Sequence, residues 1–474
     1  MIRPASIQRA HWLWVILAAG IFLSSWAALV WEQYALFLLP AGILGIYLAV
    51  WDYWVYFFLL FFFIPLSNEV AIGASRISMP TEPIMLLLTG IALLKLPLQI
   101  GKKTAGILLH PITLLLLAHI GWMLITTLTS QQHTISVKFF LAKIWFVVPF
   151  YFLSGRILLQ DHNYKKWVIA TLVATLITVT VVMARHAAYG FAFEDIKWVL
   201  WPFYPNHVIY ATLLTIFLPF VVDARRFFHR HRRGRWLMAA VIMYLVIAIY
   251  LSYTRAAMVS ILALIGIYYL VRWHVLKYVL AAALVVAMLG IRWIIRDNRF
   301  LDYAPNYERT ITNERFDKLL EATYKLEDIS VMERVYRWVA AFRMVAQRPY
   351  LGFGPGTFAE SYKPYTLRQF KTYVSDNPER SGLHCYYLMT AVDEGIPGLV
   401  IFLLFVFAVF YHGEEAYRLA ATPERRGIAM AALLSFSASC LLLLMNDMVE
   451  VDKSGSFFFL SAGLIARLRS VGGA

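Results

Sequence analysis

The chain has 474 residues, of which 61% are hydrophobic and only 15% are charged, and its mean hydropathy is +0.65. A soluble domain carries charge on roughly 25% of its residues, so most of this surface must face lipid. The formal net charge of +15 does not indicate a nucleic-acid partner, because the basic residues lie in short runs between apolar stretches and not on one face of a domain.

Apolar stretches suited to membrane helices follow one another along the chain. They cover residues 12–30, 34–50, 54–66, 83–96, 111–128, 137–153, 167–183, 208–222, 237–251, 256–271, 279–291, 399–411, 428–445 and 457–466. Several are shorter than the roughly 20 residues that cross a bilayer, so we expect about 12, and up to 14, true spans. The first stretch resembles a signal peptide, but further spans follow at once and we expect a retained helix. The sequence therefore predicts an all-α polytopic membrane protein.

Short basic runs between these stretches predict the orientation. Residues 223–235 hold six arginines against one acid, which is typical of a cytoplasmic loop. Alternation along the chain puts further basic pairs on the same side: Lys102 and Lys103, Lys165 and Lys166, Arg272 and Lys277, Arg425 and Arg426, and Arg467 and Arg469. We therefore expect both termini in the cytoplasm.

One long polar segment, residues 292–397, falls on the opposite side of the membrane. It holds 14 of the 28 acidic residues and 15 Lys and Arg residues, a balance unlike that of the basic loops. Within it, Met332, Val335, Val339 and Phe342 recur at helical spacing, which predicts an amphipathic helix over Ile329–Gln347. The expected division is a membrane part over 1–291, a largely helical extracytoplasmic domain over 292–397, and a second membrane part over 398–474.

Two arginines are candidates for binding an anion. Arg255 lies between two predicted spans, where it either snorkels to lipid headgroups or binds a ligand, because charge so near the apolar region is costly. Arg334 lies on the predicted amphipathic helix, where its alternative is a solvated face paired with Glu333 or Asp328. Arg337 shares the two interpretations of Arg334.

Residues 348–358 carry alternating glycines at 352, 354 and 356. The pattern resembles a phosphate-binding loop, but no Lys-Ser/Thr follows it and nucleotides are scarce outside the cytoplasm, so we exclude a nucleotide site. We expect a tight turn with positive backbone φ angles. Its free amides could also help to cradle a phosphate, with Gly354 as the candidate.

His384 ends the polar segment where the chain re-enters the membrane, before a helix that we expect residues 395–398 to open. A lone histidine is more often structural. However, an ordinary pKa near 6.5 makes histidine the side chain best suited to proton transfer near neutral pH. Nearby arginines should hold the pKa of His384 at or below that value.

No pattern for a disulfide, metal or cofactor is evident. Cys385 and Cys440 lie far apart, without CxxC or ligand spacing. Glu450 and Asp452, near Asp447, form the one tempting group of outward carboxylates, and we expect them to lie in a solvated loop.

An ordered set of positions runs through the second half of the chain. It comprises Arg334, Trp338, Pro349, the run 352–358, His384, Leu388, Glu394, Gly395 and Gly398, preceded by Pro205-Asn206 and Thr254-Arg255. In order and spacing, this set resembles the signature of the O-antigen ligase and polymerase superfamily, over roughly residues 205–404. One departure is Cys385, where asparagine often follows the histidine.

The resemblance implies a fold like that of the C-type glycosyltransferases, in the bacterial inner membrane with the site facing the periplasm. It implies a glycan donor linked to undecaprenyl pyrophosphate and, in a ligase, a sugar hydroxyl of lipid A-core as acceptor, among membrane lipids and without metal or cofactor. Negative charge grows on the pyrophosphate as the sugar bond breaks, and fixed arginines can stabilise it. The implied catalytic residues are His384, Arg255 and Arg334. The implied substrate-binding candidates are Arg185, Asn206, Arg337, Gly354 and Tyr387.

Other functions remain open at this point. The shared motifs do not separate a ligase from an O-antigen polymerase, although the large polar domain before His384 favours the ligase, and a protein O-oligosaccharyltransferase belongs to the same superfamily. A lipid-oligosaccharide transporter is the non-enzymatic alternative, kept open by Lys138 and Lys143 in or beside a predicted span. Convergence of the arginines and His384 at one outward site would favour an enzyme over a transporter.

Overall fold

The computed structural model describes residues 20, 22–23, 52–72, 75–95, 106–160, 162–228, 231–296, 328–371, 375–377 and 381–471. Within these ranges, nine helices are long and apolar enough to cross a membrane. The predicted stretches 12–30 and 34–50 lie outside the described residues, apart from residues 20, 22 and 23. A polytopic helical membrane protein is therefore confirmed, while the total of about 12 to 14 spans stays a prediction.

The helices follow the apolar stretches in chain order. The membrane helices and their neighbours are α3 (Tyr53–Phe63), α4 (Thr81–Lys95), α6 (Pro111–Leu128), α7 (His133–Val147) continued by a π-helical turn (Val148–Leu153) and α8 (Ser154–Leu158), α9 (Asn163–Ala188), α11 (His207–Ala224), α12 (Arg232–Tyr250), α13 (Arg255–Arg272), α14 (Leu276–Ile295), α18 (Tyr386–Arg418), α19 (Pro423–Leu442) and α20 (Asp452–Val471). The polar segment contributes the 19-residue helix α16 (Ile329–Gln347). The short helices are α10 (Ile196–Val199) and α17 (Phe358–Ser361), together with 3-10 turns at Arg225–Phe228, Lys363–Tyr365 and Arg368–Phe370.

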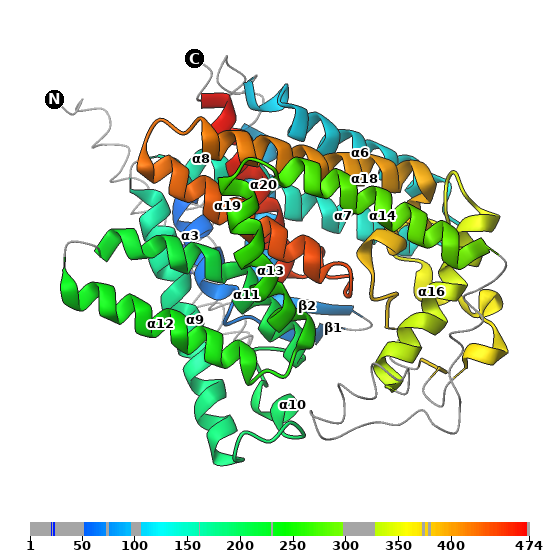
Figure 1. The fold of residues 1–474 in the computed structure, drawn as a ribbon, viewed down its shortest axis with the longest axis horizontal. Helices are drawn as coiled ribbons and strands as arrows, with labels where there is room; N and C mark the ends of the chain where they lie inside the picture. Colours follow the sequence, from blue (N-terminus) through cyan, green and yellow to red (C-terminus); the bar gives the residue numbers. More distant parts are fainter. Residues whose placement is uncertain are drawn as a thin grey trace.

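The centre of the bundle is formed by α11, α19 and α20, which pack on one another, and α18 packs on α19 and α20. These central helices bury most of their side chains, whereas the membrane window of α14 buries none. Figure 1 shows α14, α18 and α6 running alongside one another, with α16 beyond the end at which α18 begins. Aromatic rings fill the interior between α3, α9 and α11. For example, the rings of Trp167 and Phe220 pack edge to face with their centroids 5.0 Å apart.

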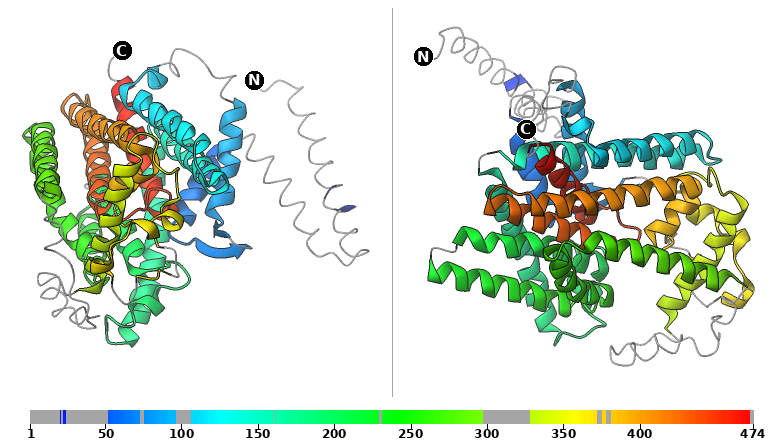
Figure 2. Two further views of the ribbon diagram at one scale, coloured as in Figure 1. Left: turned by 90° about the vertical axis from the view of Figure 1, so that its right-hand side faces the viewer. Right: turned by 45° about the horizontal axis from the view of Figure 1, so that its top comes forward.

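Two expectations from the sequence fail in detail. The all-α prediction missed an antiparallel hairpin of β1 (Asn68–Ile72) and β2 (Ser75–Met79), in which Val70 lies opposite Ile77. The hairpin lies at the edge of the bundle (Figure 2). Its strands are only five residues long, and β1 reads Asn-Glu-Val-Ala-Ile without the alternation of apolar and polar positions that would indicate a strand. The helix that residues 395–398 were expected to open begins instead at Tyr386.

The amphipathic helix of the polar segment is confirmed with its predicted boundaries, as α16. Met332, Tyr336, Val339 and Met344 are buried along one side of it, and α16 packs against α18. Asp328 caps its start, where the Oδ1 atom accepts a hydrogen bond from the Ser330 amide at 3.1 Å. This part of the polar segment is therefore fixed to α18.

Candidate active site

The first nine residues of α18 are separated from the rest by a sharp kink at Gly395, whose φ is +74°. A kink removes helical hydrogen bonds and leaves backbone groups without partners. Here the carbonyls of Val392 and Asp393 accept from the amides of Phe353 and Gly354, each at 2.9 Å, and the Ile396 amide donates to the Pro349 carbonyl at 2.7 Å. The glycine-bearing loop of residues 348–358 thus replaces the bonds that the kink breaks.

The glycines of this loop are required by its conformation and its close approach. Gly352, Gly354 and Gly356 all have positive φ angles, which confirms the predicted turn. A Cβ on Gly352 would lie 2.5 Å from the Asp393 backbone. The Gly356 amide donates to Asp393 Oδ2 at 2.9 Å. Because the amide of Gly354 also points into α18, it is not free to cradle a phosphate.

His384 immediately precedes α18 and is held from both sides. Before it, the Gly382 carbonyl accepts from Arg337 Nη1 at 2.8 Å and the Leu383 carbonyl accepts from Trp338 Nε1 at 3.2 Å. After it, the Tyr386 amide donates to the Leu443 carbonyl at 3.0 Å. His384 itself has φ +59°, a region that residues with a Cβ rarely adopt. Such strain persists only where the surroundings enforce it, as they often do at functional sites.

Asp447, in the turn between α19 and α20, lies against His384. Its Oδ1 atom is 3.7 Å from His384 Nδ1, a separation longer than a hydrogen bond but short enough for a strong electrostatic influence. Gly382 makes room for this carboxylate, because a Cβ there would lie 1.8 Å from Asp447 Oδ2. The side chains of His384 and Asp447 are 33% and 16% exposed, so the pair is reachable from outside.

The expected solvated loop around Asp447 is not what the structure contains. Glu450 accepts hydrogen bonds from Lys143 and Tyr386. Asp452 is buried and accepts from the hydroxyls of Ser67 at 2.7 Å and Thr81 at 2.8 Å. The expectation failed because partners for these acids come from distant parts of the chain. A signal was present: the acids follow an apolar stretch predicted to end on the same side of the membrane as His384.

Arg334 lies in the second turn of α16, close enough to Arg255, Arg337, Asp328 and Asp447 to interact with their charges. Its Nη1 atom donates to Ser330 Oγ at 3.3 Å, and its buried Nε atom has no hydrogen-bond partner among the described residues. No carboxylate of the described ranges lies within ion-pair distance of its guanidinium. Arg334 is therefore well placed to bind an anionic ligand.

Arg255 begins α13 and is tied to the start of α16. Its Nη2 atom lies 2.7 Å from Asp328 Oδ2, the carboxylate that also caps α16. The hydroxyl of the preceding Thr254 donates to the His207 carbonyl at 3.2 Å, at the start of α11. Arg255 thus joins the starts of two helices while remaining beside Arg334.

Burial and the neighbouring acids shift the pKa of His384 in opposite directions. Burial lowers the pKa of His384 below 6.5; Asp447 and Glu333 act to raise this pKa, and Arg334 and Arg337 act to lower it. Burial and the nearby Arg255 also lower the pKa of Arg334, yet a guanidinium keeps its charge at neutral pH. His384 is therefore largely neutral at pH 7 and able to accept a proton.

The remaining candidates from the sequence lie in several places. Arg337 is buried and holds the Gly382 carbonyl, with Glu333 at 3.5 Å. Tyr387 directs its hydroxyl away from His384, to the Cys440 carbonyl at 3.1 Å. Asn206 caps α11 by accepting from the Ile209 amide at 2.9 Å. Arg185, at the end of α9, donates to the Trp201 carbonyl. Arg337 therefore contacts the segment that carries His384, Tyr387 belongs to that segment, and Asn206 and Arg185 bond to other parts of the chain.

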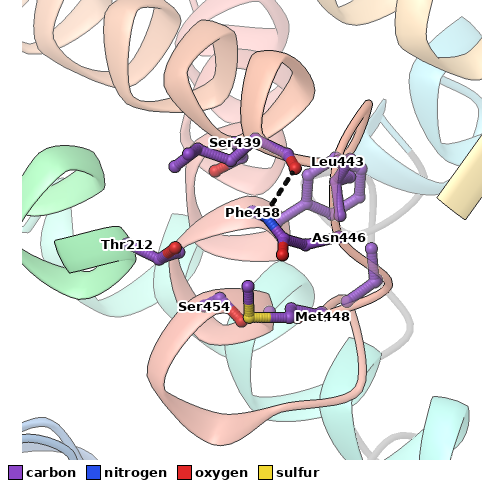
Figure 3. A pocket seen from close by; sticks show the side chains of 10 residues that line it. Thr212, Ser439, Leu443, Asn446, Met448, Ser454 and Phe458 are labelled. Carbon is purple, nitrogen blue, oxygen red and sulfur yellow. Dashed lines mark hydrogen bonds between the residues drawn. The ribbon is translucent and has the colours of Figure 1, made fainter. Parts of the chain in front are cut away.

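A small cavity lies behind the turn that carries Asp447. Thr212, Ser439, Asn446 and Ser454 line it with apolar neighbours such as Phe458 (Figure 3). The Asn446 side chain donates across its rim to the Leu442 carbonyl at 3.1 Å. With a volume of about 10 Å³ it has room for one water molecule and none for a sugar. This cavity is therefore not a substrate-binding pocket.

Comparison with known protein families supports the resemblance read from the sequence. Residues 238–403 match the model of the family described as O-antigen ligase. The matched stretch contains Arg255, Arg334 and His384, and Asp447 lies beyond its end. No curated protein matches the chain in sequence.

Proposed function

We propose that this chain, whose residues 238–403 match the model of the O-antigen ligase family, transfers O-antigen polysaccharide from undecaprenyl pyrophosphate to a sugar hydroxyl of lipid A-core. The observation that supports it best is a convergence. His384 before α18, Arg334 on α16 and Asp447 between α19 and α20 meet at one end of the bundle. Two groups suited to acid–base chemistry thus lie beside a cation that is available to an anionic leaving group.

His384 acts as general base in this proposal. Its imidazole takes the proton of the acceptor hydroxyl as that oxygen attacks the anomeric carbon of the donor. The bond between this carbon and the pyrophosphate oxygen breaks, and the electron pair leaves with undecaprenyl pyrophosphate. Asp447, on the Nδ1 side of the ring, favours a proton on Nδ1 and leaves Nε2 to face the acceptor.

Arg334 stabilises the leaving group by donating to the pyrophosphate oxygens, a planar fork-to-phosphate contact for which arginine is well suited. Arg255 supports it with a second positive charge while also holding Asp328. Because fixed cations can supply the charge stabilisation that a metal supplies elsewhere, we propose metal-independent transfer. Exhaustive chelation should leave activity intact, and activity lost on chelation and restored by Mg or Mn would contradict this.

The basic loops support the orientation. With the arginine-rich residues 223–235 in the cytoplasm, the starts of α13 and α18 and the turn after α19 all lie on the periplasmic side of the bacterial inner membrane. Both termini are then cytoplasmic, and residues 292–397 form the periplasmic domain between membrane parts 1–291 and 398–474.

The acceptor distinguishes a ligase from a polymerase. Purified protein in liposomes is given lipid-linked O-antigen together with either lipid A-core or a second lipid-linked chain. We expect product anchored on lipid A-core. Product found only on undecaprenyl pyrophosphate would replace the ligase with an O-antigen polymerase, and no product with either acceptor would refute glycan transfer between these substrates.

A further inference from the structure

Lys143, in the second half of α7, is a buried cation within the candidate membrane span His133–Leu158. Its side chain is 2% exposed. The Nζ atom donates to the Tyr386 hydroxyl at 2.6 Å and to Glu450 Oε1. The Tyr386 hydroxyl in turn donates to the same carboxylate oxygen at 2.9 Å. A charge at this depth is costly unless it is paired, so this three-residue cluster is specified in the fold and not incidental.

The cluster brackets the segment that carries Asp447. Tyr386 holds residues 443–450 at both ends: its amide donates to the Leu443 carbonyl at 3.0 Å, and its hydroxyl bonds to Glu450. Tyr386 also lies two residues after His384. Tyr386 therefore fixes the distance between the turn of Asp447 and the segment of His384. Lys143 in turn holds the ring of Tyr386 against Glu450.

We infer that Lys143 is a positioning residue that sets the alignment of Asp447 with His384 by neutralising Glu450 and orienting Tyr386. This inference rests on the proposed function, because the alignment matters only if His384 takes up the acceptor's proton. Lys143 touches neither His384 nor Asp447 and acts through the segment 443–450. Without it, the Glu450 carboxylate would be left uncompensated in an apolar interior, and the segment would relax towards water and carry Asp447 with it.

A matched control exists on the same helix. Lys138 lies five residues before Lys143, and therefore on a different face of α7, where it lines an open groove with Val137, Leu141 and Trp145. Lys138→Met removes the same charge from the same helix without touching Tyr386 or Glu450. It should leave turnover, donor KM and pH profile as in the wild type.

The test compares Lys143→Met, Glu450→Gln and the double variant in the full-length protein, with lipid-linked O-antigen and lipid A-core as substrates. We expect Lys143→Met to lower kcat by about tenfold to a hundredfold, the size of effect that a misplacement of about 1 Å produces, with donor KM changed less than twofold. Because Asp447 would move away from His384, the acid limb of the pH profile should shift to lower pH. Arg334, Arg337 and Glu333, the other charged neighbours of His384, stay in place on α16.

The double variant tests the pairing itself. It holds no buried charge at this point, so its kcat should recover at least severalfold over Lys143→Met, a non-additive outcome expected only of residues that act together. A purely structural lysine would lower the yield of folded protein but leave kcat and the pH profile of the folded fraction unchanged, and that result overturns the inference. If Lys143→Met yields no folded protein, Glu450→Gln is compared with the double variant, and a double variant no more active than the single one overturns it.

Hydrogen exchange separates this inference from the proposed function. Lys143→Met should speed amide exchange across residues 443–450, and Lys138→Met should not. If Lys143→Met leaves amide exchange in residues 443–450 unchanged, the positioning role of Lys143 is contradicted, even if no glycan transfer is ever observed. Absence of transfer by the wild-type protein contradicts the proposed function alone.

Discussion

The residues that the sequence marks as binding candidates on the outer side fall into two regions with different uses of polar groups. In residues 185–207, Arg185 donates to the Trp201 carbonyl and Asn206 caps α11, so the polar atoms serve nearby backbone groups. In the region around His384, charged side chains from α13, α16, the start of α18 and the α19–α20 turn lie close together in space, although they are far apart in the sequence. The comparison favours a role in the reaction for the charges around His384, whereas Arg185 and Asn206 bond to backbone groups of their own region.

The largest effect is expected at His384, and its absence would contradict the comparison. His384→Ala should lower kcat by about 10² to 10⁴, the usual contribution of a general base, and should leave donor binding intact. Turnover and donor binding are measured on the same purified protein. Loss of donor binding, or near-normal turnover, would remove His384 from the chemistry. In the wild type, activity should be level near pH 7 and fall only below about pH 6.5, because burial lowers the pKa of the proton-accepting imidazole.

Next in size is the difference between the two arginines. Arg334→Ala should lower kcat by about 10² to 10³, as loss of one stabilising donor at a developing negative charge does elsewhere, and Arg334→Lys should recover little of it. Arg255→Ala should cost less, because Arg255 is already engaged with Asp328. Steady-state kinetics with saturating acceptor measure both. Equal losses in the two alanine variants would mean that Arg255 contacts the donor as directly as Arg334.

A smaller and more diagnostic effect is expected at Asp447. Its carboxylate favours the protonated form of His384 and so raises the pKa of that imidazole. In Asp447→Asn this pKa should fall further, and since the neutral imidazole is the active form, activity should persist to lower pH than in the wild type. The kcat on the plateau should fall by about tenfold, because the ring loses its orienting charge. An unmoved acid limb would show that Asp447 does not influence His384.

The smallest effect is expected in the first region. Asn206→Ala should lower the free energy of unfolding by about 1 kcal/mol through loss of the helix cap, and Asn206→Ser should preserve it. Thermal unfolding in detergent and kcat of the folded fraction are compared. A kcat reduced by tenfold or more in folded Asn206→Ala would place this loop in the reaction and remove the distinction between the two regions.

The sequence predicts best where one local pattern decides the structure. The helical spacing of apolar residues predicts the buried side of α16, and the glycines at 352, 354 and 356 predict positive φ angles. It predicts poorly where tertiary contacts decide. Gly395 and Pro397 indicate a helix start, but docking of the glycine loop lets α18 begin nine residues earlier and kink. The sequence alone places Asp447 in a solvated loop with Glu450 and Asp452, because only the fold brings it to His384, 63 positions away in the chain.

The docking of residues 348–358 into the kink of α18 has a consequence for how the polar segment can be handled. The backbone amides of Phe353 and Gly354, and the carbonyl of Pro349, find their partners in a helix that enters the bilayer. A fragment containing residues 328–385 alone would leave these groups without partners and expose the apolar side of α16. Residues 348–358 and α16 are accordingly held by the membrane fold, and studies of ligand binding to them require the intact protein in a lipid or detergent environment.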